Sequence, residues 1–262
     1  MRQRLIWLVM AVAAVMPAFG SPINLGTAAT FGVLGASTVT NTGPTVINGD
    51  LGLYSGTSIT GFPPGIVNGT THDTDGVAQG AQADALTAYG TLAGMALTAN
   101  LTGQDLGGLT LLPGVYHYDS SAELTGTLTL NFEDLSDQTI VFQIGSTLTT
   151  ASASSISIIN PGTDDSVYWQ VGSSATLGTT TAFYGTIIAD TSITLTTGAT
   201  ITCGNAIALT GAVTMDTNNV STGACMAATG GGGAPEPGSV PLLGGGLFAL
   251  FLYRWQLRRR RA

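Results

Sequence analysis

The sequence has almost no positive charge outside its two ends. It contains no lysine, and its seven arginines stand at positions 2, 4, 254 and 258–261. Fourteen of the fifteen acidic residues lie within residues 21–229. Nucleic-acid binding needs Lys or Arg to neutralise phosphates, and many phosphoryl- and acyl-transfer sites also use one of them. The composition therefore excludes a nucleic-acid partner and argues against these classes of enzyme.

Cysteine and histidine are equally scarce. The two cysteines, Cys203 and Cys225, suit an exported protein, and they either form one disulfide or stay unpaired. The two histidines, His72 and His117, stand far apart and have no metal-site spacing, so we expect surface or internally paired side chains. Paired acidic residues lack the spaced oxygen ligands of a calcium loop. We expect no metal and no cofactor.

Residues 1–20 are typical of a secretory signal peptide. Two arginines precede an apolar stretch from Leu5 to Val15, and Ala18-Phe19-Gly20 offers a small-x-small cleavage site. The apolar run is too short for a membrane span and ends at Pro17. The sequence therefore predicts export, with a mature chain that begins at Ser21.

The C-terminal region combines a Gly/Pro linker over 230–239, which contains Pro235, Glu236 and Pro237, with an apolar segment and an arginine cluster over 240–262. This order resembles the PEP-CTERM sorting signal of Gram-negative bacteria. The resemblance implies transient membrane insertion of the tail, cleavage by an exosortase, and release to the cell surface or the medium. A retained anchor is the alternative, which the short apolar stretch disfavours.

Residues 21–229 are long enough for one domain with a proper core, and they are repetitive. The segment Thr139–Ser146 recurs as Ser166–Ser173, and apolar residues alternate with threonine in short runs such as Ile193-Thr194-Leu195. This period of two, rich in β-branched residues, indicates strands. Stacked coils of such strands satisfy the backbone groups and build one continuous core, so the pattern predicts a β-solenoid.

One segment departs from the strand pattern. Between about residues 75 and 96, apolar residues recur at helical spacing, and Asp73 or Asp75 is placed to cap the first turn. The predicted apolar stripe consists of Ala78, Ala81, Ala85, Leu86, Tyr89, Leu92, Ala93 and Ala96. We expect this α-helix to cover one face of the solenoid.

Four motifs carry a resemblance to a known family. They are LGTAATF at 25–31, NTGPTVINGDLG at 41–52, AQADA at 81–85 and LTLLPGVY at 109–116. Together with the coils, they resemble the microbial ice-binding proteins. The resemblance implies a mainly β, discontinuous β-solenoid (β-helix) with one long α-helix packed along one face. It also implies adsorption to ice through a flat Thr/Ser-rich face. We expect a secreted, monomeric protein that is not an enzyme.

Two sets of side chains are candidates for that face, and the first set is our first choice. The first set is aligned on the motif Thr-Gly-Ala-Thr at 197–200, which resembles the T-A/G-x-T/N pattern of some family members. The residues at the matching positions of this coil and its neighbours are Ser152, Ser155, Thr179, Thr181, Thr197, Thr200, Thr217 and Asn219. The second set is a threonine column of Thr129, Thr149, Thr176, Thr194 and Thr214. Either set is also compatible with an ordinary solvated strand surface.

The alternative function is a cell-surface or matrix adhesin that binds polysaccharide. Such a protein would offer aromatic platforms, for which Tyr168, Trp169, Phe183 and Tyr184 are the candidates within the coils. A polysaccharide-cleaving enzyme is disfavoured, because the domain lacks the basic residue that such a site usually uses.

Overall fold

A computed structural model of the chain describes residues 23–223. The predicted signal peptide at 1–20, the linker at 230–239, the sorting tail at 240–262 and Cys225 all lie outside the described residues. Cys203 is disulfide-bonded. Within residues 23–223, no helix combines the length and the apolar character that crossing a membrane requires.

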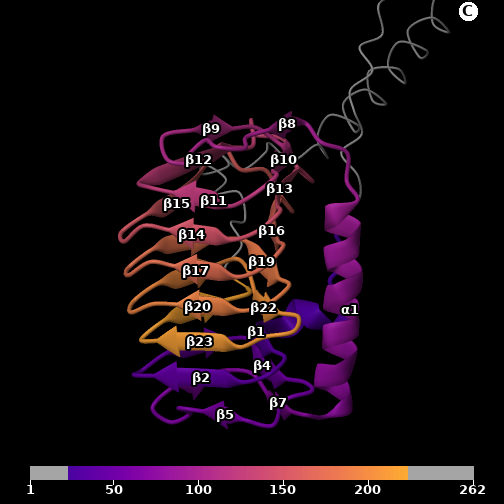
Figure 1. The fold of residues 1–262 in the computed structure, drawn as a ribbon, viewed down its shortest axis with the longest axis vertical. Helices are drawn as coiled ribbons and strands as arrows, with labels where there is room; N and C mark the ends of the chain where they lie inside the picture. Colours follow the sequence, from indigo (N-terminus) through magenta and orange to yellow (C-terminus); the bar gives the residue numbers. More distant parts are fainter. Residues whose placement is uncertain (1–22, 224–262) are drawn as a thin grey trace, which may run out of the picture. The chain divides into compact units, whose positions relative to one another are not determined.

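The described residues form a mainly β structure with three parallel sheets and one α-helix (Figure 1). Sheet A contains, in spatial order, β7 (Thr71–Asp73), β4 (Asp50–Leu53), β1 (Phe31–Gly35), β22 (Ala206–Ala208), β19 (Thr186–Ala189), β16 (Ser166–Val171), β13 (Thr139–Ile144), β10 (Gly114–Tyr118) and β8 (Ala99–Asn100). Sheet B contains β11 (Ala122–Leu124), β14 (Leu148–Thr150), β17 (Ala175–Leu177), β20 (Ile193–Leu195), β23 (Val213–Asp216), β2 (Val39–Thr42) and β5 (Ile59–Thr60). Sheet C contains β6 (Ile66–Val67), β3 (Val46–Asn48), β24 (Asn219–Ser221), β21 (Thr200–Thr202), β18 (Ala182–Tyr184), β15 (Ser155–Ile159), β12 (Thr127–Asn131) and β9 (Thr110–Leu111).

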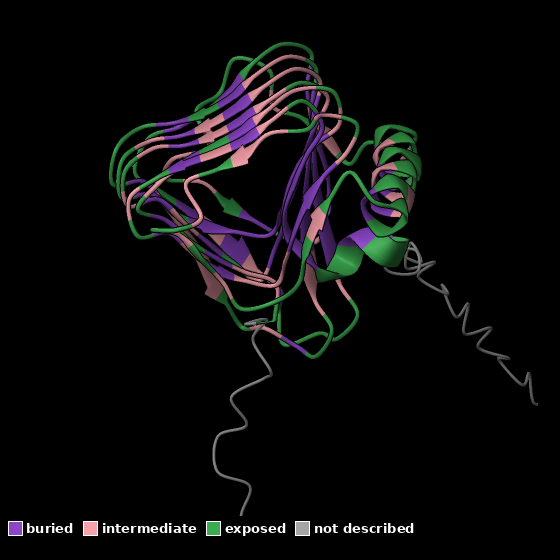
Figure 2. Cartoon of the chain, turned by 90° about the horizontal axis from the view of Figure 1, so that it is seen from below, coloured by how far each residue is buried: buried purple, intermediate pink, exposed green. Residues whose placement is uncertain are grey.

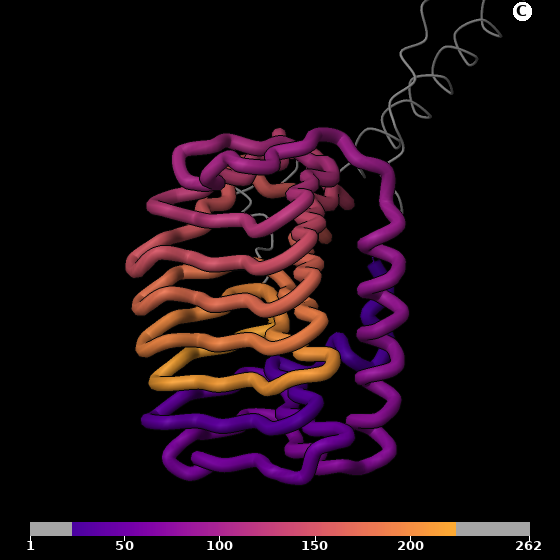
Figure 3. Tube along the Cα trace, viewed as in Figure 1, coloured from indigo at the N-terminus to yellow at the C-terminus, as the bar shows by residue number. Residues whose placement is uncertain are grey.

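The chain passes from sheet A to B to C and back to A in successive coils (Figure 3). The predicted repeat is confirmed, because β13 and β16 pair in register from Thr139 with Ser166 to Ile144 with Val171. The coils do not stack in sequence order. The last coil, β22–β24, lies against the first, β1–β3, and so joins the two ends of the described chain in the middle of the stack.

The core fills the space between the three sheets (Figure 2). Inward side chains alternate with outward ones on β14, β17 and β20 of sheet B, as the period of two predicts. Near its centre, the rings of Phe142 and Trp169 stack with centroids 3.8 Å apart and an interplanar angle of 7°, and Tyr116 and Phe183 extend the stack on either side. Aromatic contacts of this kind add to the stabilisation from buried area.

The central strands of sheet A, from β1 to β13, are buried on both faces because α1 (Gly76–Ala93) covers the outer side of the sheet (Figures 1 and 2). The predicted helix is confirmed, with Asp75 as its N-cap: the Asp75 Oδ1 accepts hydrogen bonds from the N–H groups of Val77 (3.0 Å) and Ala78 (2.9 Å). The buried stripe consists of Ala78, Ala81, Ala85, Ala88 and Leu92. The assignment of Leu86, Ala93 and Ala96 to this stripe is wrong. Leu86 is 60% exposed, Ala93 is also exposed, and Ala96 is exposed beyond the end of the helix.

Polar side chains fasten α1 to the sheet. The short 3-10 helix η1 (Gly26–Thr30) approaches α1, and there Asp84 accepts hydrogen bonds from both the N–H and the Oγ1 of Thr27, each at 2.7 Å. At the C-terminal end of α1, the buried Gln143 donates from Nε2 to the carbonyls of Leu92 (2.7 Å) and Met95 (3.0 Å).

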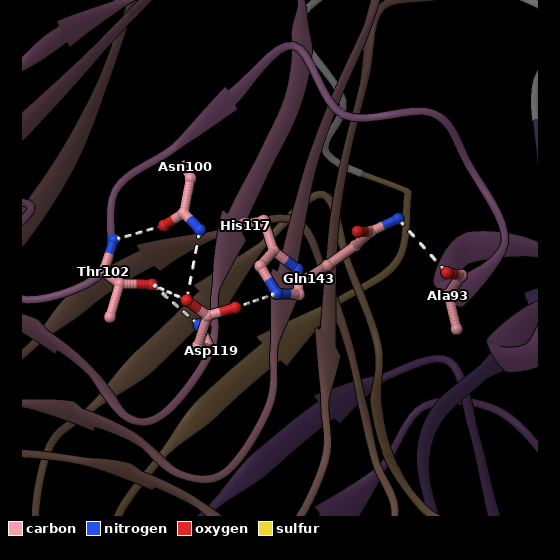
Figure 4. A network of polar contacts seen from close by, with 6 residues as sticks. All are labelled: Ala93, Asn100, Thr102, His117, Asp119 and Gln143. Carbon is pink, nitrogen blue, oxygen red and sulfur yellow. Dashed lines mark hydrogen bonds and ion pairs between the residues drawn. The ribbon is translucent and has the colours of Figure 1, made fainter.

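Both histidines are paired with aspartates. The His72 Nδ1 lies 2.7 Å from Asp75, and the His117 Nε2 lies 3.0 Å from Asp119 (Figure 4). Asp119 also accepts hydrogen bonds from Asn100 and Thr102, each at 3.2 Å, and these bonds lower its pKa, the one from Asn100 most. The cluster ties the segment after β8 to the end of β10.

Candidate functional site

The outer face of sheet B carries a row of threonines that runs from β14 to β5, across six of its seven strands. Its members pair directly across neighbouring strands and are exposed or half-exposed, and we call them the threonine row: Thr149, Thr176, Thr194, Thr214, Thr40 and Thr60. Neighbouring strands lie roughly 4.7–4.9 Å apart in such a sheet. The row is therefore a regular ladder of identical side chains, and the hydroxyls of Thr40 and Thr214 lie 3.4 Å apart.

A second row of small and hydroxyl-bearing residues runs parallel to the threonine row. Its members stand two residues earlier in each coil and are half-exposed: Thr147, Ser174, Ser192, Ala212, Thr38 and Ser58. Their carbonyls accept hydrogen bonds from the following strand position of the adjacent coil, as in the bond from Leu148 to Ser174 (3.1 Å). Two residues along a strand span about 6.6 Å, so the two rows form a two-dimensional grid.

Three first-choice candidates lie beside this grid. Ser152, Thr179 and Thr197 are exposed in the turns that lead from sheet B to sheet C, and we call this line the ridge. The turns stack in register, since the N–H of Ala153 donates to the carbonyl of Thr179 (2.8 Å) and that of Thr180 to Thr197 (3.0 Å). The two sets predicted from the sequence are therefore adjacent strips of one surface.

Thr217 does not continue the ridge. Asp216 takes that place, because the N–H of Gly198 donates to the carbonyl of Asp216 (3.1 Å) and Thr197 donates its Oγ1 hydrogen to Asp216 (2.5 Å). The prediction that aligned Thr217 with Thr197 is wrong by one residue. The turn formed by residues 216–218 is one residue shorter than the turn formed by 196–199, which shifts the register.

The other first-choice residues lie elsewhere. Thr181 is fully buried, and its hydroxyl bonds to Thr150 (2.8 Å), so it is not part of any exposed face. Ser155, Thr200 and Asn219 lie on the outer side of sheet C, where Ala182 stands between the first two.

Sheet C offers a less uniform surface than sheet B. The line that contains Ser155 continues to Val46 and Ile66, and Ile66 is 54% exposed. Thr129 also belongs to sheet C, where it pairs with Thr110 and Ser157, so its assignment to the threonine column is wrong. The true neighbour of Thr149 is Glu123. The loop at residues 132–138 lengthens this coil, and a step of twenty residues back from Thr149 therefore ends in the wrong sheet.

The charges on sheet B are acidic and few. Glu123 stands at one end of the threonine row, and Asp216 stands on the ridge. The sequence from 23 to 223 contains no Lys or Arg. The grid is therefore built from short neutral hydroxyl and methyl groups, with no long cationic side chain to disturb a flat contact.

The sequence matches the family model described as ice-binding-like over residues 33–221. The chain belongs to the ice-binding-like family. It is 56% identical to a protein named ice-binding protein from Nostoc sp. (strain HG1), over 90% of this chain and 88% of the relative. It is also 31% identical to ice-binding protein K3-B1 from Typhula ishikariensis, over 71% of this chain and 84% of the relative.

Solved structures of ice-binding proteins resemble this ice-binding-like domain. The crystal structure of the protein from the Antarctic ascomycete Antarctomyces psychrotrophicus has a TM-score of 0.73 and 44% identity, and the match covers 76% of this chain and 98% of that chain. The structure of an ice-binding protein from an Antarctic biological consortium has a TM-score of 0.74 and 44% identity, with coverage of 80% and 96%.

Two members of the threonine row were missed from the sequence of this ice-binding-like chain. Thr40 and Thr60 lie in N-terminal coils that precede the helix and join the row only because the last coil stacks on the first. A local signal existed, since Val39-Thr40 and Ile59-Thr60 repeat the apolar-Thr pairs of Ile193-Thr194 and Val213-Thr214. The two pairs were not aligned with the later coils because they are more than 80 residues away from Thr149 in the sequence.

The coil aromatics that the adhesin alternative would need are not exposed in the ice-binding-like domain. Tyr168, Trp169, Phe183 and Tyr184 are all buried. An open hollow of about 800 Å³ lies beside α1, and its lining includes Tyr54, Gln82, Leu86 and Asp190. Across residues 23–223, no three His, Cys, Asp or Glu side chains are grouped to hold a metal ion.

Proposed function

We propose that the protein adsorbs to ice through the outer face of sheet B, with the threonine row at its centre and the ridge at its border. The observation that carries the proposal is the register of the row across β14, β17, β20, β23, β2 and β5. The names of the relatives support ice as the ligand.

A grid of this kind suits a crystal surface. The β-branched threonine side chain is stiff at χ1, so each methyl and hydroxyl keeps a fixed direction. The hydroxyl bonds water, and an ordered interfacial water is enthalpically nearly as good as a direct hydrogen bond. Each contact is weak, but rigidly spaced contacts act together, and the release of the protein from a growing crystal becomes slow.

Ice partitioning tests the proposal. The purified protein is expected to enter slowly grown ice and to inhibit recrystallisation. Thr194→Tyr places a bulky ring in the centre of the row and is expected to weaken inhibition by at least about tenfold, or ~1.4 kcal/mol. Thr197→Tyr on the ridge is expected to have a smaller effect.

Thr202→Tyr is the matched control, because Thr202 is an exposed strand residue on sheet C. It is expected to keep full activity. Exclusion of the folded wild-type protein from ice would refute ice binding, and loss of activity in Thr202→Tyr alone would move the contact to sheet C. The alternative, a polysaccharide adhesin, has less support because the four coil aromatics are buried.

The finer assignments from sequence belong to the same proposal. The three-sheeted stack of coils is a discontinuous β-solenoid, and export occurs through the segment at 1–20. The tail at 230–262 serves as a PEP-CTERM signal for an exosortase in a Gram-negative host. Mass spectrometry of the mature protein tests the last two assignments, since cleavage at both ends predicts a chain that lacks both segments.

A further inference from the structure

Glu123 interrupts the grid at one end of sheet B. It is an exposed residue on β11, and it pairs directly with Thr149 of β14. It therefore occupies the position that threonine occupies on each of the next strands of the sheet. Glu123 is the acidic member of an otherwise uniform line.

The rest of β11 continues the pattern of the face. Ser121 extends the second row, because the Thr147 Oγ1 donates to the Ser121 Oγ at 2.8 Å. The backbone ladder is also intact, with Ala122, Glu123 and Leu124 in register with Leu148, Thr149 and Thr150. The scaffold for one more rung is thus in place on β11, where the side chain at position 123 departs from the pattern. Beyond this strand, the Leu106 N–H donates to the Glu123 carbonyl (2.9 Å), and the exposed Asp105 lines one hollow with Ser121 and Glu123.

The second acid on this face behaves differently. One carboxylate oxygen of Asp216 accepts from Thr197 and the other accepts from Thr217, at 2.5 and 3.0 Å. The Asp216 carboxylate therefore has hydrogen-bond partners within the protein, and it fixes the positions of the two hydroxyls. Among the described residues, the Glu123 side chain has no hydrogen-bond partner, and the domain offers no Lys or Arg to neutralise it.

An unpaired carboxylate is costly to bring against a crystal. Its charge holds water strongly, and removing that water without a compensating partner is unfavourable. The glutamate side chain is also longer than threonine and less restricted in its rotamers. Both properties oppose contact between β11 and a flat surface.

We infer that Glu123 sets the length of the ice-contacting face by ending it at Thr149, and that threonine at this position would extend the face by one rung. The inference rests on the proposed function. Glu123→Thr is expected to lower the protein concentration needed for recrystallisation inhibition about threefold, or ~0.6 kcal/mol.

The test compares Glu123→Thr with Glu123→Ala and with Asp73→Thr. The alanine variant removes the carboxylate without supplying a methyl and hydroxyl pair, and it is expected to gain less. Asp73→Thr removes the same charge from an exposed strand position on sheet A and is expected to change nothing. Circular dichroism and the melting temperature establish that each variant is folded.

The experiment distinguishes a failure of this inference from a failure of the proposed function. If Thr194→Tyr loses activity while neither folded Glu123 variant gains any, the inference is overturned and the proposed face stands. If Glu123→Thr does not fold, an unchanged Glu123→Ala overturns the inference by itself. If Thr194→Tyr keeps full activity, the proposed face is wrong. An equal gain in Asp73→Thr would assign the effect to net charge and overturn the inference.

Discussion

At the scale of single residues, the stiffness and shortness of threonine decide the character of sheet B. Inward neighbours such as Leu148 and Leu195 are fully buried or nearly so, while Thr149 and Thr194 face outward on the same strands. Burial of the flanking residues fixes the backbone, and the stiff χ1 of the β-branched side chain then fixes the direction of its methyl and hydroxyl groups. Threonine therefore acts here as a rigid surface group rather than as a common strand residue.

Asp216 is expected to position two hydroxyls at the ridge. Asp216→Ala removes the acceptors of Thr197 and Thr217 and frees their χ1 angles. Recrystallisation inhibition is expected to weaken about threefold, or ~0.6 kcal/mol, with little change in melting temperature. Asp73→Ala, an acid on sheet A, is the control. Full activity in folded Asp216→Ala would show that the ridge takes no part in ice contact.

The sequence predicted most of the threonine row and misplaced its borders. Thr149, Thr176, Thr194 and Thr214 were aligned correctly because three of their coils share the apolar-Thr-apolar triplet and the fourth, Leu148-Thr149-Thr150, differs only in its last residue. Thr129 and Thr217 were misaligned because one coil carries a long loop at 132–138 and another has a short turn at 216–218. Turn length is set by how coils stack, and the triplet pattern does not record it.

At the scale of elements, α1 and sheet A were the most predictable parts. Helical spacing and the Asp75 cap are local signals, and they placed the helix within a few residues of its observed end at Ala93. The apolar run Thr139–Ile144 is buried along its whole length, as expected for a parallel strand covered on both faces. Leu86 was misassigned because helical spacing alone does not show where the buried stripe ends.

The link between Asp84 and Thr27 predicts a pH dependence. Hydrogen bonds from the Thr27 N–H and hydroxyl lower the pKa of Asp84 below its usual 3.8. A carboxyl with a lowered folded pKa contributes stability above its unfolded pKa, and this contribution disappears as the pH falls through the folded value. Asp84→Asn is therefore expected to lower the melting temperature at neutral pH by a few °C.

The same substitution is expected to flatten the loss of stability between about pH 5 and about pH 3, because one group that releases this stabilisation is gone. Thermal unfolding followed by circular dichroism across this range measures both effects. Asp164→Asn, on an exposed turn, serves as the control. An unchanged acid profile in Asp84→Asn would show that the link between η1 and α1 does not contribute to acid sensitivity.

At the scale of the whole molecule, the threonine row is assembled from segments on both sides of α1 in the sequence. Thr40 and Thr60 precede α1, while Thr149 to Thr214 follow it, and the two groups meet where β2 pairs with β23. The repeats predict which coils are neighbours within the later half. They carry no information that the last coil returns to the first, so this junction became visible only in the structure.

The continuity of that face predicts that damage depends on position. β20 lies in the middle of sheet B, and β5 is its terminal strand. A tyrosine ring at position 194 separates the threonines on both sides of it from a flat crystal. A ring at position 60 separates only the end of the row from the crystal, and the remaining threonines can still make contact. Thr194→Tyr is therefore expected to weaken recrystallisation inhibition at least about threefold more than Thr60→Tyr, or ~0.6 kcal/mol. Equal losses would contradict this prediction and mean that ice contact needs the whole threonine row at once. A larger loss for Thr60→Tyr would place the centre of contact in the N-terminal coils.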